Sequence, residues 1–227
     1  MGYSPALGVM TAVFEIAGAF WIIMRQRSHG QRSILLPIVI SLFLLAGYQI
    51  IEVGLCWKSD GSNLFLARLG FLDITWLPPV SLLLISRLVT PRSRPLILYA
   101  RFSLFIGALL SLWIIMDYRF VTGTICEFMY ARYSNVQPWF NFYGAFYEIT
   151  QMSMIFVPAY LLSRIGDAKR RKDLSDLLIG SLLFIIPSLY VASVWPSIFE
   201  NGLPSLMCHF AIFYAVFLLR IAHREMT

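Results

Sequence analysis

The sequence is poor in charged residues, which make up 13% of its 227 residues, against about 25% in soluble domains. It lacks the phosphate-binding loop Gly-x-x-x-x-Gly-Lys, the dinucleotide-binding turn Gly-x-Gly-x-x-Gly and the zinc-binding helix motif His-Glu-x-x-His. Its 3 cysteines include no Cys-x-x-Cys pair. These absences argue against nucleotide hydrolysis, dinucleotide redox chemistry and zincin-type proteolysis, so we expect no nucleotide cofactor.

Long apolar runs dominate what the sequence does contain. Hydrophobic residues make up 59% of the chain, in runs of about 18 to 25 residues that suit a bilayer core. Backbone polar groups in lipid must be satisfied locally, which favours helices. The sequence therefore predicts an all-α polytopic membrane bundle, one domain over residues 1–227. We expect seven transmembrane helices near Ala6–Met24, Leu35–Trp57, Leu64–Leu88, Leu96–Met116, Pro138–Ser163, Leu174–Trp195 and Leu203–Ile221.

The basic residues indicate how this bundle is oriented. Of 18 Lys and Arg, 14 fall in the segments that share one side, and the other side keeps Lys58, Arg68, Arg119 and Arg132. Cytoplasmic loops carry such an excess, so we expect the N-terminus outside and the C-terminus in the cytoplasm. No basic residue precedes the first apolar run, which we expect to be a retained helix rather than a signal peptide. Topology also accounts for the net charge of +6, so no nucleic-acid partner is expected.

Several ionisable side chains lie inside the predicted helices, all in the outer half of the bundle. At about 1.5 Å of rise per residue, they lie roughly 8 to 15 Å below the outer surface. A charge at that depth costs several kcal/mol unless it is protonated, paired or hydrated, so such groups usually face the interior or a cavity. We therefore predict one shared site that binds a cation, a proton or a small ligand, formed by Glu15, Glu52, Asp73, Glu148 and His209.

Further side chains are expected to support this site. Tyr48 precedes Glu52 by one helical turn, and Gln151 lies close behind Glu148 on the same face. Arg68 is the basic group nearest to the acids, and it cannot neutralise all of them, so the surplus requires protons, a cation or a cationic ligand. In the alternative interpretation, each acid is protonated and only holds helices together through hydrogen bonds. For His209 the alternative is a histidine satisfied within the core.

The cysteines suggest a covalent link on the outer side. Cys56 ends the second predicted helix there, and Cys126 lies in the long outer loop between the fourth and fifth helices. In an oxidising compartment the two are candidates for a disulfide that pins this loop over the bundle. Cys208 is expected to be a packing residue. The loop itself is aromatic, which is typical of a lid or docking surface, or of a segment that rests on lipid headgroups.

The first and fifth predicted helices share a short pattern. "VFEIAGAF" and "FYEITQMS" place Glu15 and Glu148 at matching depth, and Asp73 and His209 are placed comparably in the third and seventh helices. Such pairs are typical of parallel internal repeats. They suggest a 3+1+3 arrangement in which the fourth helix is the linker.

Three stretches carry a family resemblance: "YSPALGVMTAVFEIAG", the helix end "YQIIEVGLCW" and "LPSLMCHFAIF". They resemble an uncharacterised bacterial family of membrane proteins with seven helices. The resemblance implies the bacterial inner membrane and carries no known activity. Microbial rhodopsins share the topology but need a lysine in the last helix, whereas Lys58, Lys169 and Lys172 all lie in loops, so a retinal Schiff base is excluded. Membrane ceramidase-like hydrolases use several histidines around zinc, where carboxylates would have to substitute here.

The sequence favours a binding protein over an enzyme. The first hypothesis is a transporter or receptor-like protein whose acidic pocket binds a cation or a small cationic ligand, and the second is a non-catalytic subunit with a membrane-protein partner. The third is a metal-dependent intramembrane hydrolase. The sequence names no substrate, cofactor or metal.

Overall fold

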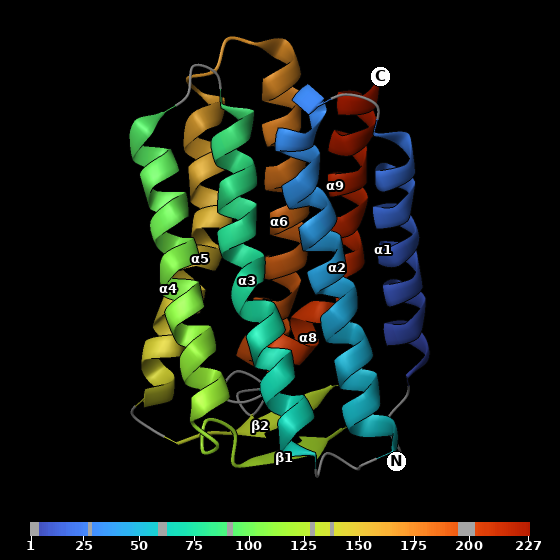
Figure 1. Cartoon of the computed structure of the whole chain (residues 1–227), viewed down its shortest axis with the longest axis vertical. Coiled ribbons are helices and arrows are strands. Elements are labelled where there is room, and N and C mark those ends of the chain that lie inside the picture. Colours follow the sequence, from blue (N-terminus) through green and yellow to red (C-terminus); the bar gives the residue numbers. More distant parts are fainter. Residues whose placement is uncertain are drawn as a thin grey trace.

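The computed structural model describes residues 5–26, 29–58, 63–89, 93–127, 130–136, 139–194 and 203–227. Within these ranges the chain is helical apart from one small two-stranded sheet, and the helices run side by side along the long axis (Figure 1). The helices are α1 (Ala6–Arg25), α2 (His29–Lys58), α3 (Leu64–Leu88), α4 (Arg94–Met116), α5 (Trp139–Leu162), α6 (Ala168–Val194), α8 (Leu203–His209) and α9 (Ala211–Met226).

The predicted all-helical class is confirmed, and each predicted apolar segment overlaps a helix. α3 has the predicted bounds and continues through Pro78 and Pro79 as one helix. Among the described residues, five helices are long and apolar enough to cross a membrane, namely α1, α2, α3, α4 and α6. The chain therefore has the character of a membrane protein, while seven crossings stay a prediction.

The last predicted segment is divided into two helices at Phe210. The amide of Phe210 donates to the carbonyl of Met207 at 2.9 Å, and that of Phe213 donates to the carbonyl of Phe210 at 3.1 Å. These are the shorter-range bonds of a tight turn, which interrupt the regular helical pattern. Figure 1 shows α8 turned away from the line of α9, so the two carry their side chains to different parts of the bundle.

The segment between α4 and α5 forms a β-hairpin that the sequence did not predict. Strand β1 (Gly123–Cys126) pairs antiparallel with β2 (Ala131–Ser134), in a register that joins Thr124 to Tyr133. The hairpin lies across one end of the bundle (Figure 1). That end holds the start of α1 and α3 and the end of α2, so the hairpin covers the half in which the sequence places the acids.

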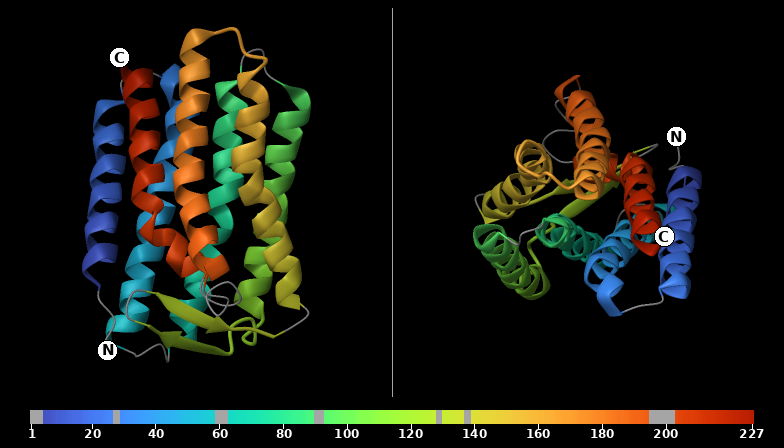
Figure 2. Two further views of the ribbon diagram at one scale, coloured as in Figure 1. Left: turned by 180° about the vertical axis from the view of Figure 1, so that it is seen from behind. Right: turned by 90° about the horizontal axis from the view of Figure 1, so that it is seen from above.

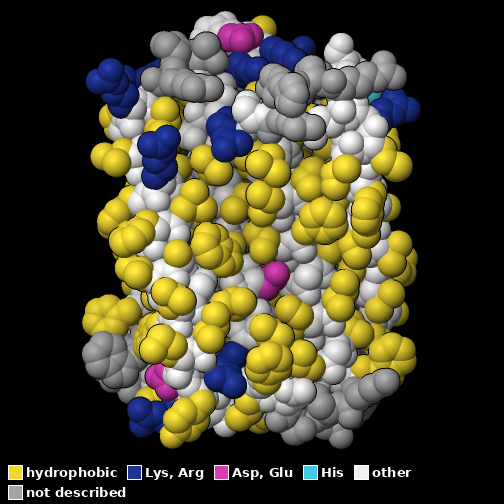
Figure 3. Space-filling model, in the orientation of Figure 1, with side chains coloured by type: hydrophobic (Ala, Val, Ile, Leu, Met, Phe, Trp, Pro, Cys, Tyr) yellow, Lys and Arg dark blue, Asp and Glu magenta, His cyan; other side chains and the backbone are white. Residues whose placement is uncertain are grey.

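The opposite end of the bundle is basic. Figure 3 shows Lys and Arg side chains gathered there, and apolar side chains over most of the long face between the two ends. α3 is the most enclosed of the candidate spans, whereas α4 lies at the outside with most of its surface exposed. Seen from above, α1 lies beside α9 and α4 lies beside α5 (Figure 2). The bundle is thus centred on α3 and α2.

Candidate functional site

Glu15 is the most isolated acid of the bundle. It lies on the inward face of α1 and is completely buried. Within the described part of the chain, neither of its carboxyl oxygens has a hydrogen-bond partner. A buried carboxyl group without a partner is costly, because it has lost its water and gained nothing in return. Its electrostatic neighbour is a second acid, Asp73 of α3, rather than a base.

Asp73 lies in the seam between α3 and α2 and is partly exposed. Its carboxyl group occupies the gap left by a missing side chain: a Cβ atom on Gly47 of α2 would lie 2.8 Å from Oδ1 of Asp73. Its Oδ2 is buried without a hydrogen-bond partner in the described part of the chain, and the lack of a side chain at Gly47 leaves room for the carboxyl group.

Glu52 of α2 and Cys208 of α8 are both buried. Three of the five predicted site residues, Glu52, Glu15 and Asp73, lie within electrostatic range of the Cys208 thiol, and they come from three different helices. The sequence placed Cys208 in the core without a role.

Side-chain amides fix α8 against its neighbours. Gln49, one residue beyond the predicted Tyr48, donates to the backbone carbonyl of Cys208. Gln151 of α5 donates from Nε2 to Sδ of Met207 at 3.0 Å, so it supports α8 rather than an acid. Sequence reasoning missed Gln49, although its spacing of three residues from Glu52 places the two on one face of α2.

Glu148 does not join this cluster, and the prediction that it does is corrected by the structure. Its side chain is exposed, because the inward face of α5 is formed instead by Tyr143, Tyr147, Thr150 and Gln151. These positions follow helical spacing, and residue 148 lies about 100° around the helix from residue 147. Glu15 and Glu148 therefore differ in burial, so this pair gives no support to an internal repeat, which stays a prediction.

Arg68 and His209 also lie differently from expectation. Arg68 borders a small hollow between α3 and α4 that is lined otherwise by apolar side chains, including Phe65 and Leu72. It faces away from the acids that it was expected to tune. His209 is half-buried, and its Nδ1 lies 3.1 Å from the carbonyl oxygen of Ser205 in its own helix. That contact agrees with the simpler interpretation of a histidine satisfied by its surroundings.

The hairpin is fastened over the acidic half at several points. Cys126 of β1 forms a disulfide with Cys56 at the end of α2, with Cα atoms 5.6 Å apart. The hydroxyl of Tyr133 in β2 lies 3.0 Å from that of Tyr48, which is itself within electrostatic range of Glu52. The amide of Ala131 donates to Oγ of Ser205 in α8 at 2.8 Å. The hairpin is therefore a fixed cap that contacts α2 and α8 directly.

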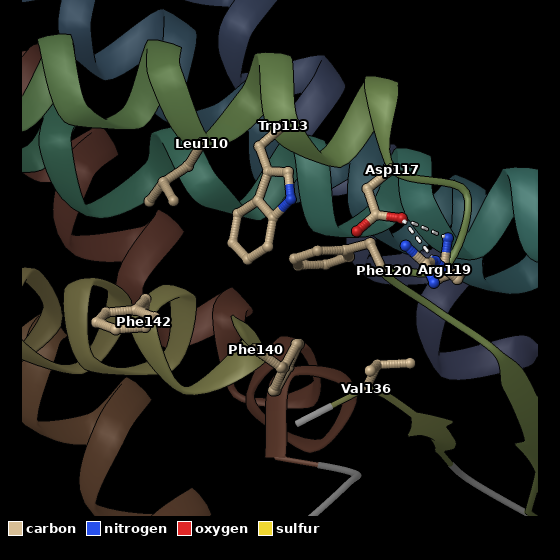
Figure 4. Close-up of a pocket in the computed structure, with 8 residues that line it drawn as sticks. All are labelled: Leu110, Trp113, Asp117, Arg119, Phe120, Val136, Phe140 and Phe142. Atoms are coloured by element: carbon tan, nitrogen blue, oxygen red, sulfur yellow. Dashed lines mark hydrogen bonds and ion pairs between the residues drawn. The ribbon is translucent and has the colours of Figure 1, made fainter. Parts of the chain in front are cut away.

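An aromatic cleft of about 580 Å³ opens beside this cap (Figure 4). Its rings also pack inward, since the centroid of Phe71 lies 5.4 Å from that of Phe120 and 5.6 Å from that of Phe140. These rings are therefore a wall between the cleft and the interior of the bundle. The cleft is lined by Leu110, Trp113, Asp117, Arg119, Phe120, Val136, Phe140 and Phe142.

The basic end contains a second set of buried acids, which sequence reasoning missed. Asp173 of α6 is fully buried, and Arg224 of α9 donates from Nε to its Oδ1 at 2.8 Å and from Nη2 to Oδ2 of Asp176 at 2.5 Å. Arg170 bonds to Glu225 at 2.6 Å. A signal was present in the sequence: acids three residues apart in one helix and arginines four residues apart in another.

The chemistry open to the acidic cluster follows from its composition. Glu15 and Asp73 form no ion pair with Lys or Arg in the described ranges, so protons or a cation are needed to neutralise them. Within those ranges, the side chains of His, Cys, Asp and Glu form no group of three or more placed to hold a metal ion. Comparison with known proteins gave no match to a family model, a curated protein or a solved structure. The resemblance to a bacterial membrane family therefore stays a prediction.

Proposed function

We propose that this chain is an integral membrane protein that binds a proton or a small cation at Glu15 and Asp73, as a transporter or a receptor-like protein. One observation carries the proposal: Glu15 is fully buried and both of its carboxyl oxygens lack a hydrogen-bond partner in the described part of the chain. Hydrogen bonds between helices, the structural alternative, would have given those oxygens partners. A buried acid without a protein partner would instead be stabilised by a bound positive charge.

Asp73 completes the proposal because it links the buried acid to the surface. It is partly exposed, and it is near enough to Glu15 for the two to interact electrostatically. Two carboxyl groups that interact in this way are most stable when they share a positive charge. A cation that enters beside Asp73 would replace a proton on the pair, and the proton would leave to the solvent. Cation binding and proton release are therefore coupled in this proposal.

Seven crossings and the orientation belong to the same proposal. Two features support seven crossings beyond the five candidate spans. α5 has 24 residues, which is long enough to cross a membrane, and α8 and α9 together cover the last apolar segment. The excess of Lys and Arg at the end away from the hairpin supports a cytoplasmic location for that end, in a bacterial inner membrane. The acidic site would then lie nearer the outside. A reporter enzyme fused after residue 227 tests this orientation. We expect activity from a reporter that works only in the cytoplasm, and none from one that works only in the periplasm.

The central experiment measures proton release and thermal stability together. Purified protein in weakly buffered detergent would be titrated with Na⁺, K⁺, Mg²⁺ and tetramethylammonium chloride. We expect one of these cations to release protons and to raise the unfolding temperature, because a ligand present at 100 times its Kd stabilises the folded state by about 2.7 kcal/mol. Glu15→Gln and Asp73→Asn should abolish both signals, and Glu148→Gln, the matched exposed control, should keep both.

The opposite result has a clear meaning. If no cation changes stability or releases protons, cation binding at Glu15 and Asp73 is overturned. A stoichiometric partner that copurifies under those conditions would then favour the complex subunit, and tightly bound zinc would favour the hydrolase.

A further inference from the structure

A groove of about 470 Å³ runs between α1 and α9 at the basic half of the bundle. The two helices lie side by side in both views of Figure 2. Phe14, Val216 and Leu219 give the groove apolar walls, and its lining ends at Arg220 and His223. From residue 14 to residue 21 of α1 the walls extend for roughly 10 Å at the helical rise. The groove is thus mainly apolar, with its charged residues at one end.

A second hollow of about 130 Å³ adjoins the charged end of this groove. The two share Trp21 and His223, whose rings stack with centroids 6.1 Å apart. The smaller hollow is lined further by Arg25, Met226 and Thr227. A stacked pair of rings therefore divides a small polar compartment at the end of the bundle from a larger apolar one below it.

Positive charge is available at this end. Arg25 is exposed at the end of α1, and in the described part of the chain it forms no ion pair. The adjoining network on α6 and α9 holds a surplus cation, with Lys169, Arg170, Arg220 and Arg224 against Asp173, Asp176 and Glu225. Arg220 is half exposed, so it remains accessible beside the groove.

The geometry points to a binding site for an anionic phospholipid, with its phosphate beside Arg25 and an acyl chain in the groove between α1 and α9. A free phosphate has no apolar part to bury in the groove. A zwitterionic lipid has no net negative charge to compensate the surplus positive charge. Basic hollows between membrane helices are known to suit anionic headgroups. Trp21 lies at the junction of head and chain, as aromatic side chains do at membrane interfaces. The site is separate from the acidic cluster and does not rest on it.

Native mass spectrometry of the full chain in detergent tests the proposal, with phosphatidylglycerol and phosphatidylcholine of the same acyl chains added in parallel. We expect phosphatidylglycerol to bind at lower concentration. Arg25→Gln should weaken its binding about fivefold, the effect of one basic side chain near a membrane surface. Arg101→Gln, also exposed and near the basic end but on α4, is the matched control and should change binding less than twofold. Val216→Trp should fill the groove and weaken binding of phosphatidylglycerol without any change of charge.

Four results would overturn the inference. Equal binding of the two lipids would show that the site does not select a negative charge. Equal losses of phosphatidylglycerol binding in Arg25→Gln and Arg101→Gln would show nonspecific electrostatic attraction. Unchanged binding in Val216→Trp, or in Val216→Phe if the larger substitution prevents folding, would exclude the groove. Displacement of phosphatidylglycerol by inorganic phosphate at equal concentration would reassign the site to a small anion. The unfolding temperature of each variant checks that it is folded.

Discussion

Asp173 in α6 and Glu15 in α1 are both fully buried carboxyl groups, yet their surroundings are opposite. Asp173 accepts a bond from Arg224 at 2.8 Å and lies 3.3 Å from Arg170. Glu15 has neither an arginine nor a hydrogen-bond partner in the described ranges, and its electrostatic neighbour is another acid. Asp173 at the basic end is therefore neutralised by side chains of the protein, whereas Glu15 has no such partner in the described ranges.

We propose that this difference separates structural acids from functional ones. A buried acid with a fixed basic partner can stabilise a helix pair, because its charge is compensated in every state of the protein. A buried acid without one destabilises the fold until a positive charge arrives, and such a cost is usual at a binding site. The four predictions below test this comparison, beginning with the largest expected effect.

Arg224→Ala should cause the greatest loss of stability. It removes the partner of both Asp173 and Asp176, and breaking a buried ion pair from one side costs about 3–5 kcal/mol. Thermal unfolding in detergent would measure the loss, with Arg164→Ala as control, since the guanidinium group of Arg164 lies over the ring of Tyr160 and forms no ion pair within the described ranges. Equal effects of the two substitutions would mean that the network does not hold α6 to α9.

Cys56→Ser should loosen the cap at the other end. The disulfide to Cys126 closes a loop with a sequence separation of 70, and loss of such a bond costs about 2–4 kcal/mol. Limited proteolysis of the hairpin would detect the change, and Cys126→Ser should reproduce it. The double substitution should add nothing further, since each single variant already removes the bond. An additive loss would show that the cysteines act separately.

Gly47→Ala should displace the Asp73 carboxyl group, because the new Cβ would lie 2.8 Å from Oδ1. Overpacking of this kind costs roughly 1–3 kcal/mol. Asp73→Ala combined with Gly47→Ala should recover most of the loss, and Gly54→Ala, whose nearest neighbour would lie at 3.8 Å, is the matched control. Double-mutant thermal unfolding measures the coupling. If the double variant recovers no stability, the contact between positions 47 and 73 does not cause the loss in Gly47→Ala.

Glu15→Met should act in the opposite direction and raise stability by about 1–2 kcal/mol in the absence of added cations, since it replaces an uncompensated polar group by an apolar one. Glu148→Met, the exposed control, should change stability by less than about 0.5 kcal/mol. Unfolding in urea or by heat distinguishes the two. A loss of stability in Glu15→Met as large as that in Arg224→Ala would remove the contrast between the two ends.

The sequence predicted the helices well and their faces poorly. Apolar length fixes where a helix lies, so α3 has the predicted bounds. It does not fix which way a side chain points when apolar residues surround the helix on all sides, as on α5, where Tyr147 faces inward and Glu148 outward. Depth alone therefore grouped Glu148 with Glu15 and Asp73, although only the last two come together.

Features that depend on contacts between different helices and strands could not be predicted from the sequence either. The hairpin strands have four residues each, too few for a clear alternating pattern, and contacts such as Tyr133 with Tyr48 help to hold them. Arg224 was recognised as a basic residue of the cytoplasmic side, but its partner Asp173 lies in another helix that only tertiary packing brings near. The candidate disulfide was visible as a pair of cysteines, and its geometry required the folded chain.

The disulfide between Cys56 and Cys126 has a further consequence of a topological kind. Together with the intervening chain it makes a covalent ring, and two complete helices, α3 and α4, lie within it. A single cut anywhere between these helices would open the ring without releasing either fragment. On a gel, the cleaved protein would migrate as one species until a reductant is added. After such a cut, α3, which carries Asp73, stays joined to α2 by peptide, and the fragment that contains α4 stays joined to α2 by the disulfide.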